Sequence, residues 1–144
     1  MIKYIIRLGI PIFVFTSICL AQWETPENLG ADINSSSDEF GPTISSDGNT
    51  LYFSSDRPGG LGDYDIWVSI QNGSVWSQPT NVGSPVNTDY TDFLPSVSTG
   101  GDTLYFISNR PVSQNLDIWM SWKMGNDWQN PVNLGPTVNS AGDE

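Results

Sequence analysis

The chain repeats itself with a period of about 53 residues, and this repeat constrains the fold more than any other feature. Three copies of the phrase Trp-x-x-Pro-x-Asn-(Leu/Val)-Gly begin at Trp23, Trp76 and Trp128. A longer phrase, Pro-x-(Ile/Val)-Ser-x-x-Gly-x-Thr-Leu-Tyr-Phe, begins at Pro42 and again at Pro95. Each copy of it is followed by Ser-x-Arg-Pro and then by Asp-Ile-Trp. Repeats of this length are units that bury their apolar faces against their neighbours.

Within each copy, short strand patterns alternate with turn signals, and no segment has the 3.6-residue period of a long helix. The chain is therefore predicted to be all-β. Asp47-Gly48-Asn49 predicts a tight turn in the first copy. The second copy has Gly100-Gly101-Asp102 at this place, so the contact that Asp47 makes in the turn is expected to be shifted or lost. Pro79 indicates an edge strand, because proline cannot donate to a ladder. A mobile loop is predicted at 58–62. The strands predicted for the first copy cover residues 43–45, 51–54, 64–70 and 76–82.

Four short antiparallel strands per repeat are typical of a β-propeller blade. The phrase Pro-x-x-Ser-x-Asp-Gly-x-x-Leu-Tyr-Phe-x-Ser, followed by Asp-Ile-Trp, resembles the WD40-like (PD40) repeat. That repeat occurs in TolB-like periplasmic proteins and in outer-membrane proteins that carry an OmpA-type peptidoglycan-binding domain. The resemblance covers residues 23–144. It implies complete four-stranded blades at about 41–83 and 94–135, with partial strands at 23–30 and 136–144.

Propellers usually close with about four to eight blades, so two complete blades form an incomplete propeller. The first interpretation is that the chain is the N-terminal piece of a longer protein, in which strand 23–30 would complete the last blade. The alternative is that two or three copies assemble one ring. Open blade faces are expected to make the chain marginally stable and prone to self-association.

Residues 1–21 are predicted to be a signal peptide, with two basic residues, an uncharged run and a cleavage site after Ala21. The run is shorter than the roughly 20 apolar residues of a membrane span. The alternatives are a retained anchor and lipidation at Cys19, although Ile18 fits a lipidation motif poorly. The repeat domain, residues 22–144, is therefore expected in the periplasm or at the outer membrane, with secretion as the alternative.

Charge and residue types exclude several functions. Residues 22–144 keep all 16 acidic residues but only Arg57, Arg110 and Lys123 as cations. Nucleic-acid binding is not expected, because it depends on Lys and Arg neutralising phosphates. Tight binding to an anionic membrane, beyond a lipid or peptide anchor, is not expected either. The chain has no histidine, and its one cysteine is Cys19, so a zinc site, a Ser-His-Asp triad and a disulfide are not predicted.

Arg57 and Arg110 occupy the same position of the repeat, and Asp65 and Asp117 follow on the next predicted strand. The interpretation is an arginine–aspartate pair within each blade, Arg57 with Asp65 and Arg110 with Asp117, that holds the intervening loop. The alternative is a ring of arginines that binds anions or carboxylates. The planar, bidentate guanidinium suits either role.

Loops between strands two and three, and those between blades, emerge on one face of a propeller. This face is the candidate partner-binding surface, because loops on a rigid scaffold commonly carry binding residues. Ca²⁺ favours oxygen ligands, but the spacing is not that of a calcium loop, so solvated carboxylates are the simpler interpretation. No metal or cofactor is predicted. The candidate residues are Asp56, Arg57, Asp63, Asn87, Asp89, Asp92 and Arg110.

Tryptophans that recur with the period are interpreted as packing between blades rather than as a platform for sugars. Trp122 breaks the repeat at the position of Ile70 and is predicted to be an exposed contact. The recurring tryptophans are Trp23, Trp67, Trp76, Trp119 and Trp128.

The resemblance implies a non-catalytic binding or scaffold module of the bacterial cell envelope, with a protein or a peptidoglycan-associated partner. The alternative is the propeller domain of an exported hydrolase, a peptidase or a glycosidase. Nothing in the spacing of the acidic residues selects a pair for glycoside hydrolysis. Since propellers carry many unrelated activities, fold alone does not decide between these functions, and no enzymatic activity is predicted.

Overall fold

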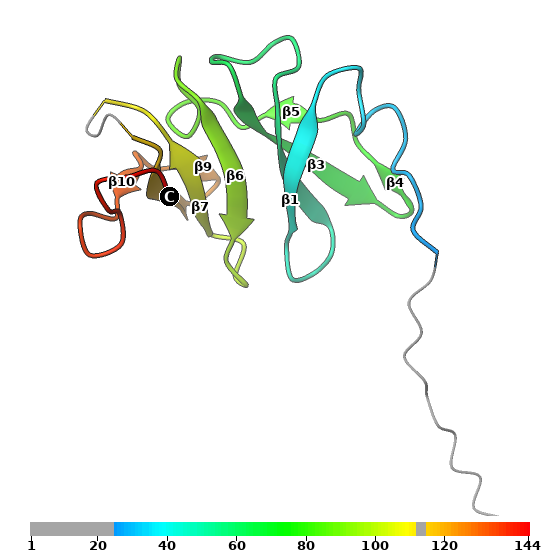
Figure 1. The fold of residues 1–144 in the computed structure, drawn as a ribbon. Helices are drawn as coiled ribbons and strands as arrows, with labels where there is room; N and C mark the ends of the chain where they lie inside the picture. Colours follow the sequence, from blue (N-terminus) through cyan, green and yellow to red (C-terminus); the bar gives the residue numbers. More distant parts are fainter. Residues whose placement is uncertain (1–24, 112–114) are drawn as a thin grey trace, which may run out of the picture.

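The computed structural model describes residues 25–111 and 115–144, and these residues form strands but no helix. The prediction of an all-β chain is therefore confirmed, while the predictions for residues 1–21 and for Trp23 lie outside the described residues. Two antiparallel sheets follow each other along the chain (Figure 1). The first contains β1 (Glu39–Ile44), β2 (Thr50–Ser55), β3 (Asp65–Asn72), β4 (Val75–Trp76) and β5 (Thr80–Asn81). The second contains β6 (Asp92–Val97), β7 (Thr103–Ser108), β8 (Asp117–Met124), β9 (Asp127–Trp128) and β10 (Val132–Asn133).

Both sheets have the same topology. In the first, β1, β2 and β3 form a meander, and the free edge of β3 pairs with both β4 and β5. In the second, β8 pairs with β9 and β10 in the same way. The single fourth strand predicted at 76–82 is therefore wrong. Pro79 lies between β4 and β5, where its missing N–H costs no ladder bond.

The first strand of each sheet begins earlier than predicted. β1 starts at Glu39, and its pairing with β2 shifts between Phe40 and Thr43. The same irregularity recurs in β6. This β-bulge accommodates Pro42, which cannot join the ladder. Its residue with positive φ is Gly41 in the first sheet and Leu94 in the second, with φ of 58° and 51°.

The β1–β2 turn depends on an aspartate. Asp47 accepts hydrogen bonds from Ser45 Oγ at 2.5 Å and from Asn49 N at 3.0 Å. In the second sheet, Ser98 Oγ instead donates to Asp102 at 3.0 Å. The aspartate contact is therefore shifted along the chain, as the sequence led us to expect, and the turn is retained.

The sheets pack face to face, with β6 against the first sheet (Figure 1). Alternate residues of β3 point to opposite faces, so Ile66 and Trp67 belong to different apolar clusters. The outer face of the first sheet carries Leu51, Phe53 and Trp67, which Ile33 covers from the preceding segment. Among the residues described, no helix is present that could cross a membrane. The core between the sheets consists of Tyr52, Ile66, Val86, Leu104, Phe106 and Trp119.

Candidate functional site

Three segments with the same sequence pattern flank the sheets, and we call them linkers. The first, residues 30–39, leads into the first sheet; the second, 83–92, joins the two sheets; the third, 135–144, follows the second sheet. Each linker contains an asparagine and ends in an acidic residue. The asparagines are Asn34, Asn87 and Asn139, and the acidic residues are Glu39, Asp92 and Glu144.

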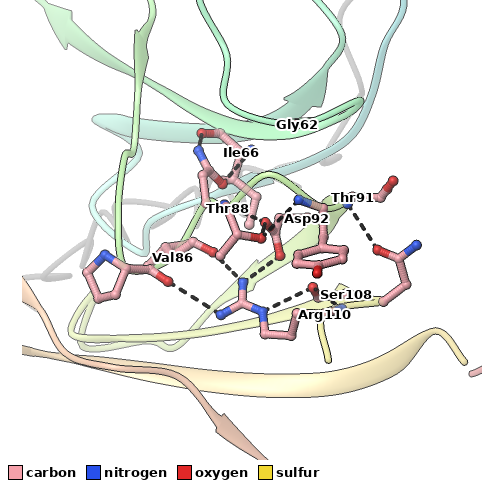
Figure 2. Close-up of polar contacts among 12 residues, drawn as sticks. Gly62, Ile66, Val86, Thr88, Thr91, Asp92, Ser108 and Arg110 are labelled. Atoms are coloured by element: carbon pink, nitrogen blue, oxygen red, sulfur yellow. Dashed lines mark hydrogen bonds and ion pairs between the residues drawn. The ribbon is translucent and has the colours of Figure 1, made fainter. Parts of the chain in front are cut away.

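Arg110 fastens the second linker to the second sheet (Figure 2). Its Nη2 donates to Val86 O and to Asp92 Oδ1, both at 2.5 Å, and its Nε donates to Ser108 Oγ at 3.1 Å. Nη1 donates to Pro85 O at 3.4 Å. Asp92 is fully buried. The guanidinium therefore donates its hydrogen bonds to groups of this chain, and it neutralises the buried carboxylate of Asp92.

Arg57 repeats this arrangement in the first sheet. Its Nη2 donates to Ile33 O at 2.6 Å and to Glu39 Oε1 at 2.9 Å, and its Nε donates to Ser55 Oγ at 3.2 Å. Both guanidinium groups also lie over two aromatic rings, which favours a cation there. The distances to the ring centroids are 4.8 Å for Phe53 and 5.3 Å for Trp67, and 5.0 Å for Phe106 and 5.1 Å for Trp119.

The predicted pairs of Arg57 with Asp65 and of Arg110 with Asp117 are wrong. Each arginine reaches back to the first residue of its own sheet, because β-pairing places Glu39 opposite Ser55 and Asp92 opposite Ser108, two residues before the arginine.

The aspartates on β3 and β8 bind other groups. Asp65 accepts from Leu61 N at 2.5 Å, and burial raises the pKa of its carboxyl. Asp117 accepts from Asn133 Nδ2 at 2.7 Å. These carboxylates therefore hold a loop and a neighbouring strand, without an arginine.

Asn87 fastens the second linker to the first sheet. Its Oδ1 accepts from Ile66 N at 3.0 Å, and its Nδ2 donates to Ile66 O and to Asn81 Oδ1, both at 2.8 Å. Asn139 binds Ile118 in the same way, at 2.9 and 3.0 Å. The second linker is thus held to the sheet before it by an asparagine and to the sheet after it by an arginine.

Exposed acidic side chains gather at the end of the molecule that carries the β2–β3 loop, which we call the loop end. Asp38 N donates to Asp56 Oδ1 at 3.0 Å. Burial, followed by the negative charges of Asp56, Asp38 and Asp63, raises the pKa of Tyr64. Tyr64 in turn lies 5.1 Å from Phe40, edge to face, and Phe40 lies 6.0 Å from Phe93 of the second sheet. The loop end therefore combines negative charge with a bridge of aromatic rings.

The loop of residues 56–64, part of which was predicted to be mobile, packs against the second linker. A Cβ atom on Gly62 would overlap the carbonyl group of Tyr90, so this contact requires glycine. Asp92 N also donates to Tyr64 O at 2.8 Å. Close backbone contacts thus fix the position of the acidic side chains on this loop.

The candidate residues fall into two groups. Asp56, Asp63 and Asp89 are exposed, and for them partner binding stays a prediction. The side chain of Arg57 is largely buried and engaged by Glu39. Asp38, Phe40 and Tyr64 were not among the predicted site residues. Asp38 and Phe40 precede the predicted start of the first strand at residue 43, and Tyr64 is predicted only as a strand residue. The candidates that are buried in the linker contacts are Asn87, Asp92 and Arg110.

The lowered pKa of Glu39 predicts that the stability of the fold depends on pH. Burial raises its pKa, but hydrogen bonds from Ser35, Arg57 and Ser55 outweigh burial, so its pKa lies below the ordinary range. A carboxyl with a lowered pKa stabilises the fold above its unfolded-state pKa, and this stability is lost as the pH falls through its folded-state pKa. Glu39→Gln is therefore expected to lower the urea midpoint at pH 7, by a difference from wild type that shrinks in acid. The exposed Glu27→Gln is the control, and a difference independent of pH would contradict the assignment.

The described residues contain no group of three or more His, Cys, Asp or Glu side chains that could hold a metal ion. No protein-family model matches the sequence, and no curated protein matches it at a significant level.

Proposed function

We propose that the chain is a non-catalytic binding module of the bacterial cell envelope and that its two sheets are blades of a β-propeller. The observation that supports this most is the equivalence of the two sheets. They share one strand order, one arginine contact and one asparagine contact, and a single linker joins them. A module that repeats one rigid unit presents its loops at fixed spacing, which is what a binding scaffold requires.

The proposed binding surface is the loop end. Asp56 and Asp63 are exposed there, next to Tyr64 and Phe40. Negative charge attracts a basic partner, and aromatic rings favour contact with cationic groups. The partner is therefore proposed to be an envelope protein, or a component associated with peptidoglycan, that offers a basic segment. The envelope location depends on the predicted signal peptide and on the resemblance to TolB-like and OmpA-linked proteins.

A crosslinking experiment in the host envelope tests this function. A photoreactive residue at position 63 is expected to form an adduct with a partner. The same residue at position 127, the exposed first residue of β9 at the opposite end, is expected to form none. With the label at position 63, Asp56→Asn is expected to reduce the adduct several-fold, since rim charges mainly change association rates.

Equal adducts from both ends, or none from position 63, would contradict a binding surface at the loop end. Sensitivity of the adduct to lysozyme would identify a peptidoglycan-associated partner. Turnover of peptide or glycoside substrates by the chain would favour the alternative, a domain of an exported hydrolase.

A further inference from the structure

The outer face of the second sheet is built like the face of the first sheet that packs in the core, yet it lies open. Tyr105 is 38% exposed, whereas Tyr52, at the same repeat position, is 3% exposed. Val138 is 50% exposed, whereas Val86 is fully buried. Trp122 lies on this face too, because it alternates along β8 with the buried Trp119 and Ser121. The face is therefore apolar without a cover in the described part of the chain.

The outer face of the first sheet carries the side chains that would cover it. Leu51, Phe53 and Trp67 occupy the repeat positions of Leu104, Phe106 and Trp119, which fill the core between the sheets. Ile44 is 50% exposed, whereas Val97, at the same position of the second sheet, packs against that core.

The open face of the second sheet also carries polar groups like those that join the two sheets. Between the sheets, Ser46 Oγ donates to Thr99 O at 2.7 Å, and Val97 N donates to Thr43 Oγ1 at 3.5 Å. On the second sheet, Ser96 and Thr99 occupy the positions of Thr43 and Ser46, so hydroxyl groups are again available on the open face.

The third linker repeats the acceptor groups that bind an arginine at the other two linkers, and no arginine from residues 25–111 or 115–144 is paired with it. Glu144 stands at the position of Glu39 and Asp92, which each bind the arginine of the sheet that follows. Its Oε1 accepts from Ser140 N at 2.7 Å, while its Oε2 is buried and has no hydrogen-bond partner among the residues described. A buried carboxylate oxygen without a partner is costly, and a charged donor would relieve that cost.

We propose that a second copy of this chain docks head to tail, with its first sheet on the open face of the second sheet. The contact rebuilds, between molecules, the interface that already joins the two sheets. Only one linker can lie next to the docked sheet, so Ile33 of the second copy moves off the outer face that it covers in the single chain. Arg57 of that copy then exchanges Ile33 O and Glu39 for Val138 O and Glu144. Two copies joined in this way at both ends present four sheets, the smallest number with which propellers usually close. This inference rests on the proposed blade geometry and not on the proposed partner.

Sedimentation velocity of the full chain tests the proposal with two surface variants. Ile44→Asp blocks the head of each copy, and Tyr105→Asp blocks the tail. Each variant alone is expected to be monomeric at concentrations at which the wild type associates, with self-association weakened at least about tenfold. A mixture of the two variants is expected to form a 1:1 dimer, because one intact head meets one intact tail.

Leu61→Asp is the matched control, since Leu61 is similarly exposed but lies on the loop end, and it is expected to associate like the wild type. All variants share residues 1–24, so differences between them report on the sheet faces. Circular dichroism checks the fold, and Ile44→Ser with Tyr105→Ser replaces the pair if a charge unfolds it. A monomeric wild type, self-association of Ile44→Asp, or a monomeric mixture would overturn the proposal. None of these results bears on binding at the loop end, which position 63 tests separately.

Discussion

Arg110→Met is expected to lower the free energy of unfolding by about 3–5 kcal/mol, the cost of leaving a buried charge without its partner. Methionine keeps an aliphatic stem between Phe106 and Trp119 but donates nothing to Asp92. That carboxylate is fully buried and, among the described residues, would keep the hydrogen bonds from Thr88 N and Thr88 Oγ1, each at 2.7 Å. Urea denaturation at pH 7 measures the change, as a lower midpoint with an unchanged slope.

Arg57→Met is the matched control, because Arg57 occupies the same repeat position with the same kind of partners. The side chain of its partner Glu39 is 12% exposed, against 0% for Asp92, so water can solvate the stranded charge. The loss is therefore expected to be clearly smaller than for Arg110. Equal losses at both positions, or none at Arg110, would contradict the role assigned to burial.

Asn87→Ala is expected to cost about 2–4 kcal/mol, since it strands buried polar groups that each contribute about 1–3 kcal/mol. Asn87 is fully buried, and its side chain binds both Ile66 N and Ile66 O. Alanine would leave Ile66 N without this acceptor and would remove one donor to Asn81 Oδ1, which would keep the hydrogen bond from Gly83 N. Because the same residue joins the linker to the first sheet, the loss should weaken the connection between the two sheets as well as the first sheet itself.

Asn34→Ala provides the control for this prediction. Asn34 holds the same position in the first linker, but it is exposed, and its side chain donates to Asn28 Oδ1 at 3.0 Å. Its replacement is expected to change the unfolding free energy by no more than about 0.5 kcal/mol, as is usual for surface positions. Both variants are measured by urea denaturation. Similar losses at positions 34 and 87 would show that the linker contacts do not stabilise the fold as described.

Most of the strands could be predicted because the same pattern of strands and turns occurs in both copies of the repeat. The turn at Gly48, the alternation along β3 and the positions of β2 and β3 all follow from local sequence pattern. The predicted strand boundaries are wrong near prolines, where the lack of an N–H group conflicts with pairing to the neighbouring strand. The bulge around Pro42 lets β1 start at Glu39, whereas Pro79 divides the fourth strand into two. Neither outcome can be deduced from propensity, because it depends on which N–H groups the neighbouring strand needs.

The contacts of the candidate site were harder to predict. The repeat suggests that Arg57 pairs with Asp65, the carboxylate that follows it on the next strand. Its partner is Glu39, which precedes it, because the ladder between β1 and β2 brings Glu39 close. A signal was present in the sequence: Glu39 lies 18 residues before Arg57, as Asp92 does before Arg110. The linker asparagines also recur with the period, but only the structure shows that Asn87 binds the backbone of Ile66. One loop-end contact recurs with the period too, since Asp56 accepts from Asp38 N as Asn109 accepts from Thr91 N, both at 3.0 Å.

The double-mutant cycle on Arg110 tests the central claim, that each arginine joins its sheet to the preceding linker, most directly. Unfolding free energies are measured for Arg110→Met, Asp92→Asn, Asp117→Asn and the two double variants. The expected coupling energy between Arg110 and Asp92 is about 1–3 kcal/mol, as for residues in direct contact, and that between Arg110 and Asp117 is near zero. Coupling to Asp117 with none to Asp92 would contradict the account and restore the pairing within the blade.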